Sequence, residues 1–228
     1  MGVTPQTDPY PAADFDDWAD TYDSDVITED VFPFARYAQV LQTVAALTGA
    51  TQGMSVLDIG TGTGNLAVLL ATRGCELWGT DFSEAMLAQA RAKLPQAHFM
   101  RHDMRNGWPS ELPRTFDRAV SAYVFHHLPL GDKIRLCRDI VEQRLIPGGA
   151  LLIADLSFPD RAAMDAFAAS IGHLWEQEDY WLADEALAGL RAAGLFADYL
   201  QVSPCAGVYV IKAAGEPAGG AATRPGGY

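Results

Sequence analysis

Residues 56–67 have the sequence VLDIGTGTGNLA, and this stretch decides the fold of the 228-residue chain. An apolar run with one acid, Asp58, ends in three glycines that alternate with threonines, and a helical pattern follows at once. This order predicts a strand, a tight turn and a helix N-terminus, the junction at which open α/β sheets hold their ligands. Glycines there let the main chain approach a ligand where a Cβ atom would collide.

The residues around the glycines indicate which ligand the turn binds. A dinucleotide-binding turn needs glycine at position 65, where this chain has Asn65, and a phosphate-binding P-loop needs a nearby lysine that the stretch lacks. The carboxylate of Asp58 would repel a pyrophosphate and attract a cation, and S-adenosylmethionine carries a sulfonium and an ammonium group but no phosphate. The D-x-G-x-G-x-G pattern from Asp58 to Gly64 resembles motif I of the class I S-adenosylmethionine-dependent methyltransferases.

The charge of the chain argues against nucleic-acid and membrane partners. The formal net charge is −13, from 16 basic and 29 acidic residues, and every charged side chain before Arg36 is acidic. Such a surface repels phosphate backbones and anionic lipids. We therefore expect no nucleic-acid or membrane partner. The partners that remain are a small-molecule substrate and, if the chain is not a monomer, a second copy in a homodimer.

The cysteines and the lack of targeting patterns favour a cytoplasmic protein. Cys75, Cys137 and Cys205 are well separated and have no CxxC spacing, which is typical of reduced thiols. No signal-peptide pattern opens the chain, and no apolar run approaches the length of a membrane span.

Strands and helices alternate along the chain at a spacing that predicts a parallel, doubly wound α/β sheet. Ser83 and Asp132 are expected to cap two of the helices, and Asp184 a third. The resemblance implies one Rossmann-like sheet of seven strands, with the last antiparallel to the rest. The expected strands are 55–59, 75–80, 97–102, 116–122 and 150–155, with a hairpin of 197–202 and 207–212, and the expected helices include 34–47, 66–72, 84–94, 161–176 and 185–193.

The expected organisation is an N-terminal helical lid segment at 1–50, a cofactor-binding core at 51–213 and a disordered tail at 214–228. A substrate-side insertion is expected at about 159–182. Four acids, Asp58, Asp81, Asp103 and Asp155, fall at the ends of predicted parallel strands. Because such ends meet at one edge of the sheet, we expect these carboxylates to form the floor of one cleft.

The segment from Asp14 to Ser24 carries Phe15, Trp18 and Tyr22 on one face of a helical pattern. It is either a short amphipathic helix packed on the domain or a lid over the cofactor. The W-x-x-x-Y-D pattern resembles the opening of many small-molecule methyltransferases, which implies that Tyr22 lies beside the methionine end of the cofactor and that Trp18 lies near the substrate.

Several residues are expected to bind the cofactor. Asp81 ends the second strand and can accept hydrogen bonds from both ribose hydroxyls, although an acid there can also cap a helix. Asp58 is expected to orient main-chain amides or the ligand's ammonium group, or to hold the turn. The resemblance implies that Asp103 accepts from the adenine amino group. The remaining expected contacts are Gly60, Thr61, Gly62, Phe82, Met104, Ser121 and Ala122, with Tyr123 on the substrate side.

His126 and His127 follow the fourth strand as a pair. No third ligand stands at a recognisable spacing, so we expect no metal site. One imidazole can act as a general base or contact the substrate, because it titrates near neutral pH. We assign His127 to the base and His126 to the substrate, while packing behind the site remains the alternative.

The C-terminal third is rich in aromatic residues. Tyr180, Trp181 and Tyr209 can form the core or a substrate wall whose rings stabilise a cation. We place all three in the substrate wall.

The resemblance implies methyl transfer from S-adenosylmethionine to a small molecule, with release of S-adenosylhomocysteine. Two alternatives stay open: an enzyme that uses S-adenosylmethionine itself as substrate, as a cyclase or a lyase that releases methylthioadenosine, and a non-catalytic sensor of an adenosyl ligand.

Overall fold

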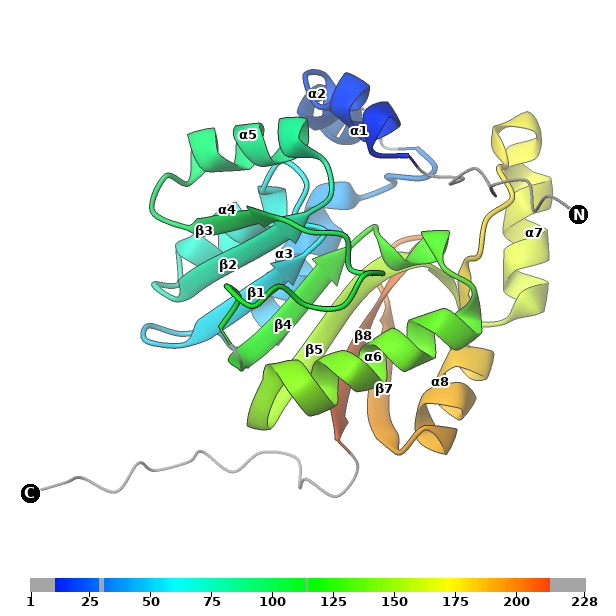
Figure 1. The fold of residues 1–228 in the computed structure, drawn as a ribbon. Coiled ribbons are helices and arrows are strands. Elements are labelled where there is room, and N and C mark those ends of the chain that lie inside the picture. The colour runs from blue at the N-terminus through cyan, green and yellow to red at the C-terminus, as the bar shows by residue number, and fades with distance from the viewer. Residues whose placement is uncertain (1–10, 29–30, 114, 214–228) are drawn as a thin grey trace, which may run out of the picture.

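The structure, a computed structural model, describes residues 11–28, 31–113 and 115–213 (Figure 1). Its strands are β1 (Ser55–Ile59), β2 (Glu76–Asp81), β3 (His98–Arg101), β4 (Phe116–Ala122), β5 (Leu145–Phe158), β6 (Trp181–Leu182), β7 (Leu195–Gln201) and β8 (Ala206–Ala213). Its α-helices are α1 (Ala12–Trp18), α2 (Tyr22–Thr28), α3 (Tyr37–Leu47), α4 (Asn65–Ala71), α5 (Glu84–Lys93), α6 (Leu130–Arg144), α7 (Arg161–Ile171) and α8 (Ala183–Ala192). Two 3-10 helices, η1 (Phe125–His127) and η2 (Gly172–Leu174), complete the described elements.

Seven strands form one sheet in the order β3-β2-β1-β4-β5-β8-β7. The first five of these run parallel, and β8 is antiparallel to both β5 and β7. This confirms the Rossmann-like sheet with an antiparallel end. The order reverses between β1 and β4, so that their carboxyl ends open a crevice at the switch point. The short β6 pairs separately with the end of β5.

Both faces of the sheet are covered by helices, and the central strands bury apolar residues on both faces. Val56 and Val120 point to the face that packs on α3 and α4, whereas Leu57 and Ile59 point to the opposite face with α6 and α8. Figure 1 shows α6 and α8 in front of the sheet and α3 behind it. The alternation of side chains along each strand therefore fills two cores at once.

Several element boundaries differ from the predictions. The helix expected at 34–47 begins at Tyr37, because Arg36 has a φ of +59° and lies outside the helical region. The helix expected at 161–176 ends at Ile171, where Gly172 has a φ of +58°. The aromatic segment from Asp14 to Ser24 forms parts of two helices, α1 and α2, rather than one.

The caps were predicted correctly in one case of three. The Ser83 hydroxyl accepts a hydrogen bond of 3.1 Å from the Met86 amide at the start of α5, as predicted. Asp132 does not cap α6, because that helix already begins after Pro129. Asp184 likewise lies inside the first turn of α8. In both helices the acid still lies near the positive end of the helix dipole.

Among the described residues, no helix is both long enough and apolar enough to cross a membrane. The predicted tail at 214–228 lies outside the described residues.

Candidate active site

A cavity of about 450 Å³ opens at the carboxyl ends of the parallel strands. Its walls come from the glycine turn after β1, the ends of β2 and β4, the segment after β3, and η1. The N-terminal helices α1 and α2 and the loop at 175–180 complete it. The cavity therefore lies at the switch point, where the sequence placed the ligand.

Two glycines of the turn, Gly60 and Gly62, differ in what surrounds them. Gly60 has a φ of +67°, and a Cβ atom there would overlap the side chain of Val124 in the loop after β4. Gly62 has a φ of +54°, but a Cβ atom there would meet no protein atom within 4 Å. Gly60 therefore allows two loops to approach each other, while Gly62 presents its backbone to the open space of the cavity.

Asp81 lies at the end of β2 with its carboxylate fixed by two amides. The Gly62 amide donates to Oδ2 and the Ser83 amide to Oδ1, each at 2.9 Å. Burial raises the pKa of Asp81 to about 6, although these amide bonds oppose the shift. Each oxygen keeps a lone pair that is available to a ligand, because a carboxylate oxygen can accept more than one hydrogen bond.

Asp58 lies beneath the turn and does not line the cavity. It is 1% exposed, and it accepts a hydrogen bond of 2.7 Å from the Thr61 hydroxyl. Burial raises the pKa of Asp58 to about 7. The geometry therefore corresponds to the second of the two roles considered for this acid, in which it holds the turn.

Asp103 follows β3 and lines the cavity together with Met104. Its two oxygens lie 2.9 Å from the Nε and Nη2 atoms of Arg105, in a forked ion pair. Asp81 and Asp103 thus share the cavity, but Asp58 and Asp155 do not. Of the four carboxylates that were expected to form the floor of the cleft, only these two line the cavity.

Two acids connect the helices α1 and α2 to α5 and to the glycine turn. Asp16 accepts hydrogen bonds from the Ser83 hydroxyl at 2.5 Å and from the Ala85 amide at 3.2 Å, at the start of α5. Asp23 accepts from the Thr63 hydroxyl at 2.6 Å and pairs with Lys93 at 2.6 Å. These contacts explain why acids and aromatic residues alternate in this segment.

The aromatic residues of α1 and α2 face the cavity. Phe15, Trp18 and Tyr22 all line it, and the rings of Phe15 and Phe82 meet edge to face at 4.9 Å. Burial raises the pKa of Tyr22 well above its usual range. Its phenol is therefore a neutral hydroxyl at physiological pH.

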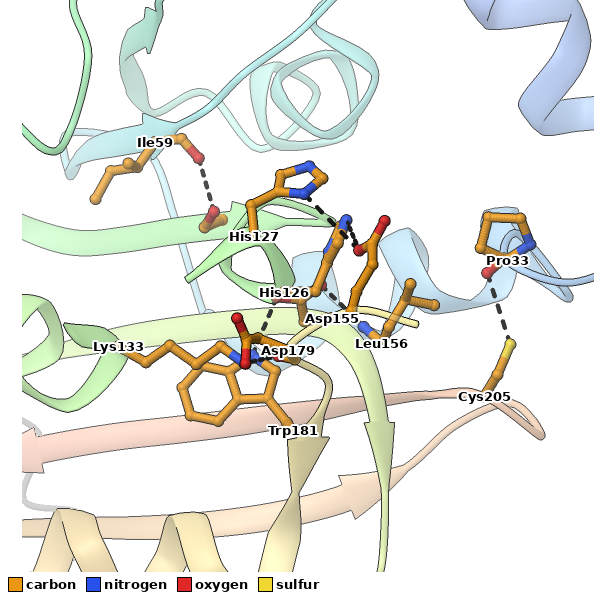
Figure 2. Close-up of polar contacts among 12 residues, drawn as sticks. Pro33, Ile59, His126, His127, Lys133, Asp155, Leu156, Asp179, Trp181 and Cys205 are labelled. Atoms are coloured by element: carbon orange, nitrogen blue, oxygen red, sulfur yellow. Dashed lines mark hydrogen bonds and ion pairs between the residues drawn. The ribbon is translucent and has the colours of Figure 1, made fainter. Parts of the chain in front are cut away.

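The paired histidines have different environments (Figure 2). His126 is buried, and its Nδ1 lies 2.6 Å from Oδ1 of Asp155. Burial alone would raise the pKa of Asp155, but His126 lowers it below its usual value, so the carboxylate is ionised. Burial and the neighbouring His126 lower the pKa of His127 to about 3. His127 is therefore a neutral and weakly basic imidazole.

Comparison with known proteins gives a consistent result. Residues 56–149 match the family model described as a methyltransferase domain. The chain is 36% identical over 160 residues to an uncharacterized methyltransferase of Bacillus cytotoxicus, and the matched region covers 66% of this chain and 69% of that protein. It is 34% identical over 174 residues to an uncharacterized methyltransferase of a Geobacillus species, covering 75% of this chain and 78% of the relative.

The chain belongs to the class I S-adenosylmethionine-dependent methyltransferases. The fold agrees. A solved complex of DhpI with SAM and HEP superposes with a TM-score of 0.71 at 18% identity, covering 92% of this chain and all of that one. The resemblance drawn from the glycine turn is thereby confirmed, as is the enzyme class.

The methyltransferase fold brings most of the predicted site residues to the cavity. Those that line it are Trp18, Tyr22, Gly60, Gly62, Asp81, Phe82, Asp103, Met104, Ala122, Tyr123, His126, His127 and Tyr180.

Five predicted residues are not brought to the cavity. Besides Asp58 and Thr61, Ser121 donates its hydroxyl to the Ile59 carbonyl at 2.7 Å and joins β4 to β1. Trp181 is fully buried, and its indole donates to Asp155 at 3.0 Å. Tyr209 is fully buried, and its hydroxyl lies 2.8 Å from that of Ser157. The aromatic pair therefore belongs to the core between the sheet, α6 and α8.

Several residues that the sequence did not indicate also line the cavity. Phe32, Pro33 and Phe34 line the cavity from the segment before α3, and Glu176 and Glu178 line it from the loop before β6. The alternation Phe-Pro-Phe is a local signal for the first group, because proline in a short aromatic run interrupts a helix. Nothing local indicates Glu178, whose position depends on how the loop at 175–180 folds back.

Proposed function

We propose that this enzyme transfers the methyl group of S-adenosylmethionine to a small-molecule acceptor and releases S-adenosylhomocysteine. The observation that carries the proposal is a single cavity with two parts: the space beside the glycine turn, and a chamber beneath α1 and α2. The walls of this aromatic chamber are Phe32, Phe34, Tyr123 and Tyr180. One end of it suits an adenosyl ligand, and the other offers space for an acceptor next to it.

The residues at the cofactor end fit S-adenosylmethionine. Asp81 has lone pairs for the two ribose hydroxyls, and the open backbone at Gly62 leaves room for the ligand. Asp103 would accept from the adenine amino group beside the apolar cover of Met104. No lysine or arginine lies in the glycine turn to neutralise a phosphate, which favours a cationic ligand over a dinucleotide. The DhpI complex with SAM and HEP, which has the same fold, supports this assignment.

The dimensions of the cavity favour a small acceptor. About 450 Å³ lies within the range of about 300–1,000 Å³ that is typical of small-molecule pockets, and the cofactor must share it. The chamber walls are aromatic: Phe32 and Phe34 come from one side and Tyr123 and Tyr180 from others. Such a chamber would enclose an acceptor with apolar or planar groups and exclude water from the reaction.

The chemistry places modest demands on the protein. The sulfonium is a good leaving group, so the main task is to align the acceptor with the methyl group in a dry pocket. Proximity and orientation can supply as much as ~7–11 kcal/mol of the barrier. The helices α1 and α2 would act as the lid, with Tyr22 as a neutral hydroxyl near the methionine end. His127 is a poor general base, because burial lowers its pKa to about 3.

The proposal is tested by following a labelled methyl group. Purified enzyme is incubated with methyl-labelled S-adenosylmethionine and a cell extract that has been separated into small-molecule and macromolecular fractions. We expect label in the small-molecule fraction, together with stoichiometric S-adenosylhomocysteine. Label in proteins or nucleic acids contradicts the small-molecule acceptor. Methylthioadenosine as the product indicates cleavage of the cofactor itself, and tight binding without turnover in any fraction indicates a sensor.

A further inference from the structure

Three side chains of the types that can ligate a metal ion meet at one wall of the cavity. His126 and His127 come from η1, and Glu178 comes from the loop before β6. One donor atom of each lies within 4.8 Å of the other two. The Oε2 atom of Glu178 is 3.5 Å from Nε2 of His126 and 3.8 Å from Nδ1 of His127. The third ligand that the sequence did not indicate is thus supplied by a residue far away in the chain.

The ring of His126 is held in place by Asp155 (Figure 2). Asp155 is fully buried, and its Oδ1 lies 2.6 Å from Nδ1 of His126 and accepts a hydrogen bond of 2.9 Å from the Leu156 amide. Because this oxygen already acts as an acceptor, we assign the proton between the two groups to Nδ1, which donates to the carboxylate. Trp181 donates to the other oxygen of Asp155 at 3.0 Å, which keeps the carboxylate in place. An imidazole that donates one N–H to a buried carboxylate and presents its other nitrogen to a cavity is the usual arrangement of a metal ligand.

This orientation creates an electrostatic requirement. With Nδ1 held by Asp155, His126 turns its other ring nitrogen, Nε2, toward the Glu178 carboxylate, 3.5 Å away. Two acceptors that face each other at this separation repel, unless a proton or a cation lies between them. His127 brings a second ring nitrogen, Nδ1, to within 3.8 Å of the same Glu178 oxygen. A cation with three ligands satisfies the whole cluster, whereas a proton satisfies only one pair.

We propose that His126, His127 and Glu178 form a binding site for a divalent transition-metal ion of the zinc type. Two imidazoles and one carboxylate suit Zn²⁺, Co²⁺ or Fe²⁺, while Mg²⁺ and Ca²⁺ prefer oxygen ligands. Ligand atoms at about 2.0–2.2 Å from such an ion lie roughly 3.3–3.6 Å apart in a tetrahedron. The separations of 3.5 and 3.8 Å between the Glu178 oxygen and the two ring nitrogens are close to this spacing.

Three protein ligands leave a coordination position open toward the cavity. Together with the proposed function, on which this step rests, the open position indicates an acceptor with a hydroxyl group. An oxygen bound to the ion loses its proton to solvent at lower pH than a free hydroxyl does. The oxygen then attacks the methyl carbon, the carbon–sulfur bond breaks with its electron pair left on sulfur, and the products are a methyl ether, S-adenosylhomocysteine and one released proton.

The test measures metal binding by the full chain, independently of methyl transfer. Enzyme stripped with a chelator is titrated with Zn²⁺ by calorimetry and with Co²⁺ by visible absorption. We expect one ion per chain, and a Co²⁺ spectrum of nitrogen and oxygen ligands without thiolate charge transfer. His127→Ala and Glu178→Gln should each weaken binding at least tenfold, whereas His102→Ala, at another histidine of the same cavity, should not change it.

Affinity for S-adenosylmethionine is measured on the same samples, so that loss of the metal site is distinguished from failure of the proposed function. Circular dichroism confirms that each variant is folded. If His127→Ala does not fold, Glu178→Gln alone decides, because this near-isosteric change lies in a surface loop. The proposal is overturned if neither ion binds saturably, if the Co²⁺ spectrum shows thiolate ligands, or if folded Glu178→Gln binds as tightly as the unaltered enzyme. The cluster would then be bridged by a proton.

Discussion

The carboxylate of Asp23 in α2 accepts a hydrogen bond of 2.6 Å from the Thr63 hydroxyl in the glycine turn. The same carboxylate accepts from Asn65 at 2.9 Å and pairs with Lys93 at 2.6 Å. One acid therefore connects the N-terminal helices to the turn and to α5. Asn65 stands where a dinucleotide-binding turn has glycine, and here its amide contributes to this connection.

Asp23→Asn is expected to weaken S-adenosylmethionine binding by about threefold to tenfold, because the helices over the cavity lose their charged anchor. The effect is moderate because Asp23 is partly exposed and its ion pair is screened by water. Isothermal titration measures it, and Asp17→Asn, at an exposed acid in α1, is the matched control. Equal affinities of the two variants would show that the anchor has no part in binding.

Asp81→Ala is expected to weaken cofactor binding at least tenfold while the fold is retained. The change removes an acceptor for the ribose hydroxyls, and charge-assisted hydrogen bonds contribute about 1.5–3 kcal/mol each. It also leaves the Gly62 and Ser83 amides without their partner, so a small decrease in melting temperature is expected. Calorimetry gives the affinity and circular dichroism the fold. An unchanged dissociation constant would refute the ribose assignment.

The strands of the central sheet were the most predictable part of the structure. The sequence located β1 and β4 residue for residue. The strand β1 is a short, mostly apolar run that leads into the glycine turn, and β4 has the buried run 119–121 near its end, before the loop that carries the histidines. The glycine turn, Asp81 and Asp103 were also predicted at the cavity, because the ends of parallel strands meet at one edge whatever the rest of the chain does.

The other side of the site could not be predicted, because it depends on contacts between distant segments. Tyr180 and Trp181 are adjacent aromatic residues, so the flanking sequence does not distinguish them. Yet Tyr180 lines the cavity and Trp181 is buried. The difference arises from the short pairing of β6 with the end of β5, which turns Trp181 toward α6. The same loop brings Glu178 close to His126 and His127. No local sequence pattern predicts this contact between distant segments.

Stability of the ligand-free enzyme is expected to fall as pH rises from 5.5 to 8. Burial raises the pKa of Asp58 from 3.8 to about 7, so the folded state holds this proton more tightly than the unfolded chain does. The stabilisation is complete below the unfolded pKa and is lost as pH rises through the folded value. Over the tested range Asp58 contributes about 2 kcal/mol.

Urea denaturation at the two pH values measures this dependence, and Asp58→Asn should make it smaller. The dependence that remains in the variant combines two opposing groups: the raised pKa of Asp81, about 6, lowers stability as pH rises, whereas the lowered pKa of His127, about 3, increases it up to about pH 6.5. If Asp58→Asn keeps the full dependence, the Asp58 carboxyl is not the group that titrates.

Trp181→Ala is expected to lower the free energy of unfolding by about 3–5 kcal/mol, the usual cost of deleting a buried aromatic side chain. Its ring is fully buried against Phe125 and Tyr209, and its indole is a donor to Asp155. Tyr180→Ala serves as the matched change at the adjacent position, which is half-buried and lines the cavity. Its cost in urea denaturation should be less than half as large, since only part of the ring leaves water on folding. Equal losses in the two variants would place Tyr180 in the core as well, and the aromatic chamber would then lose one of its walls.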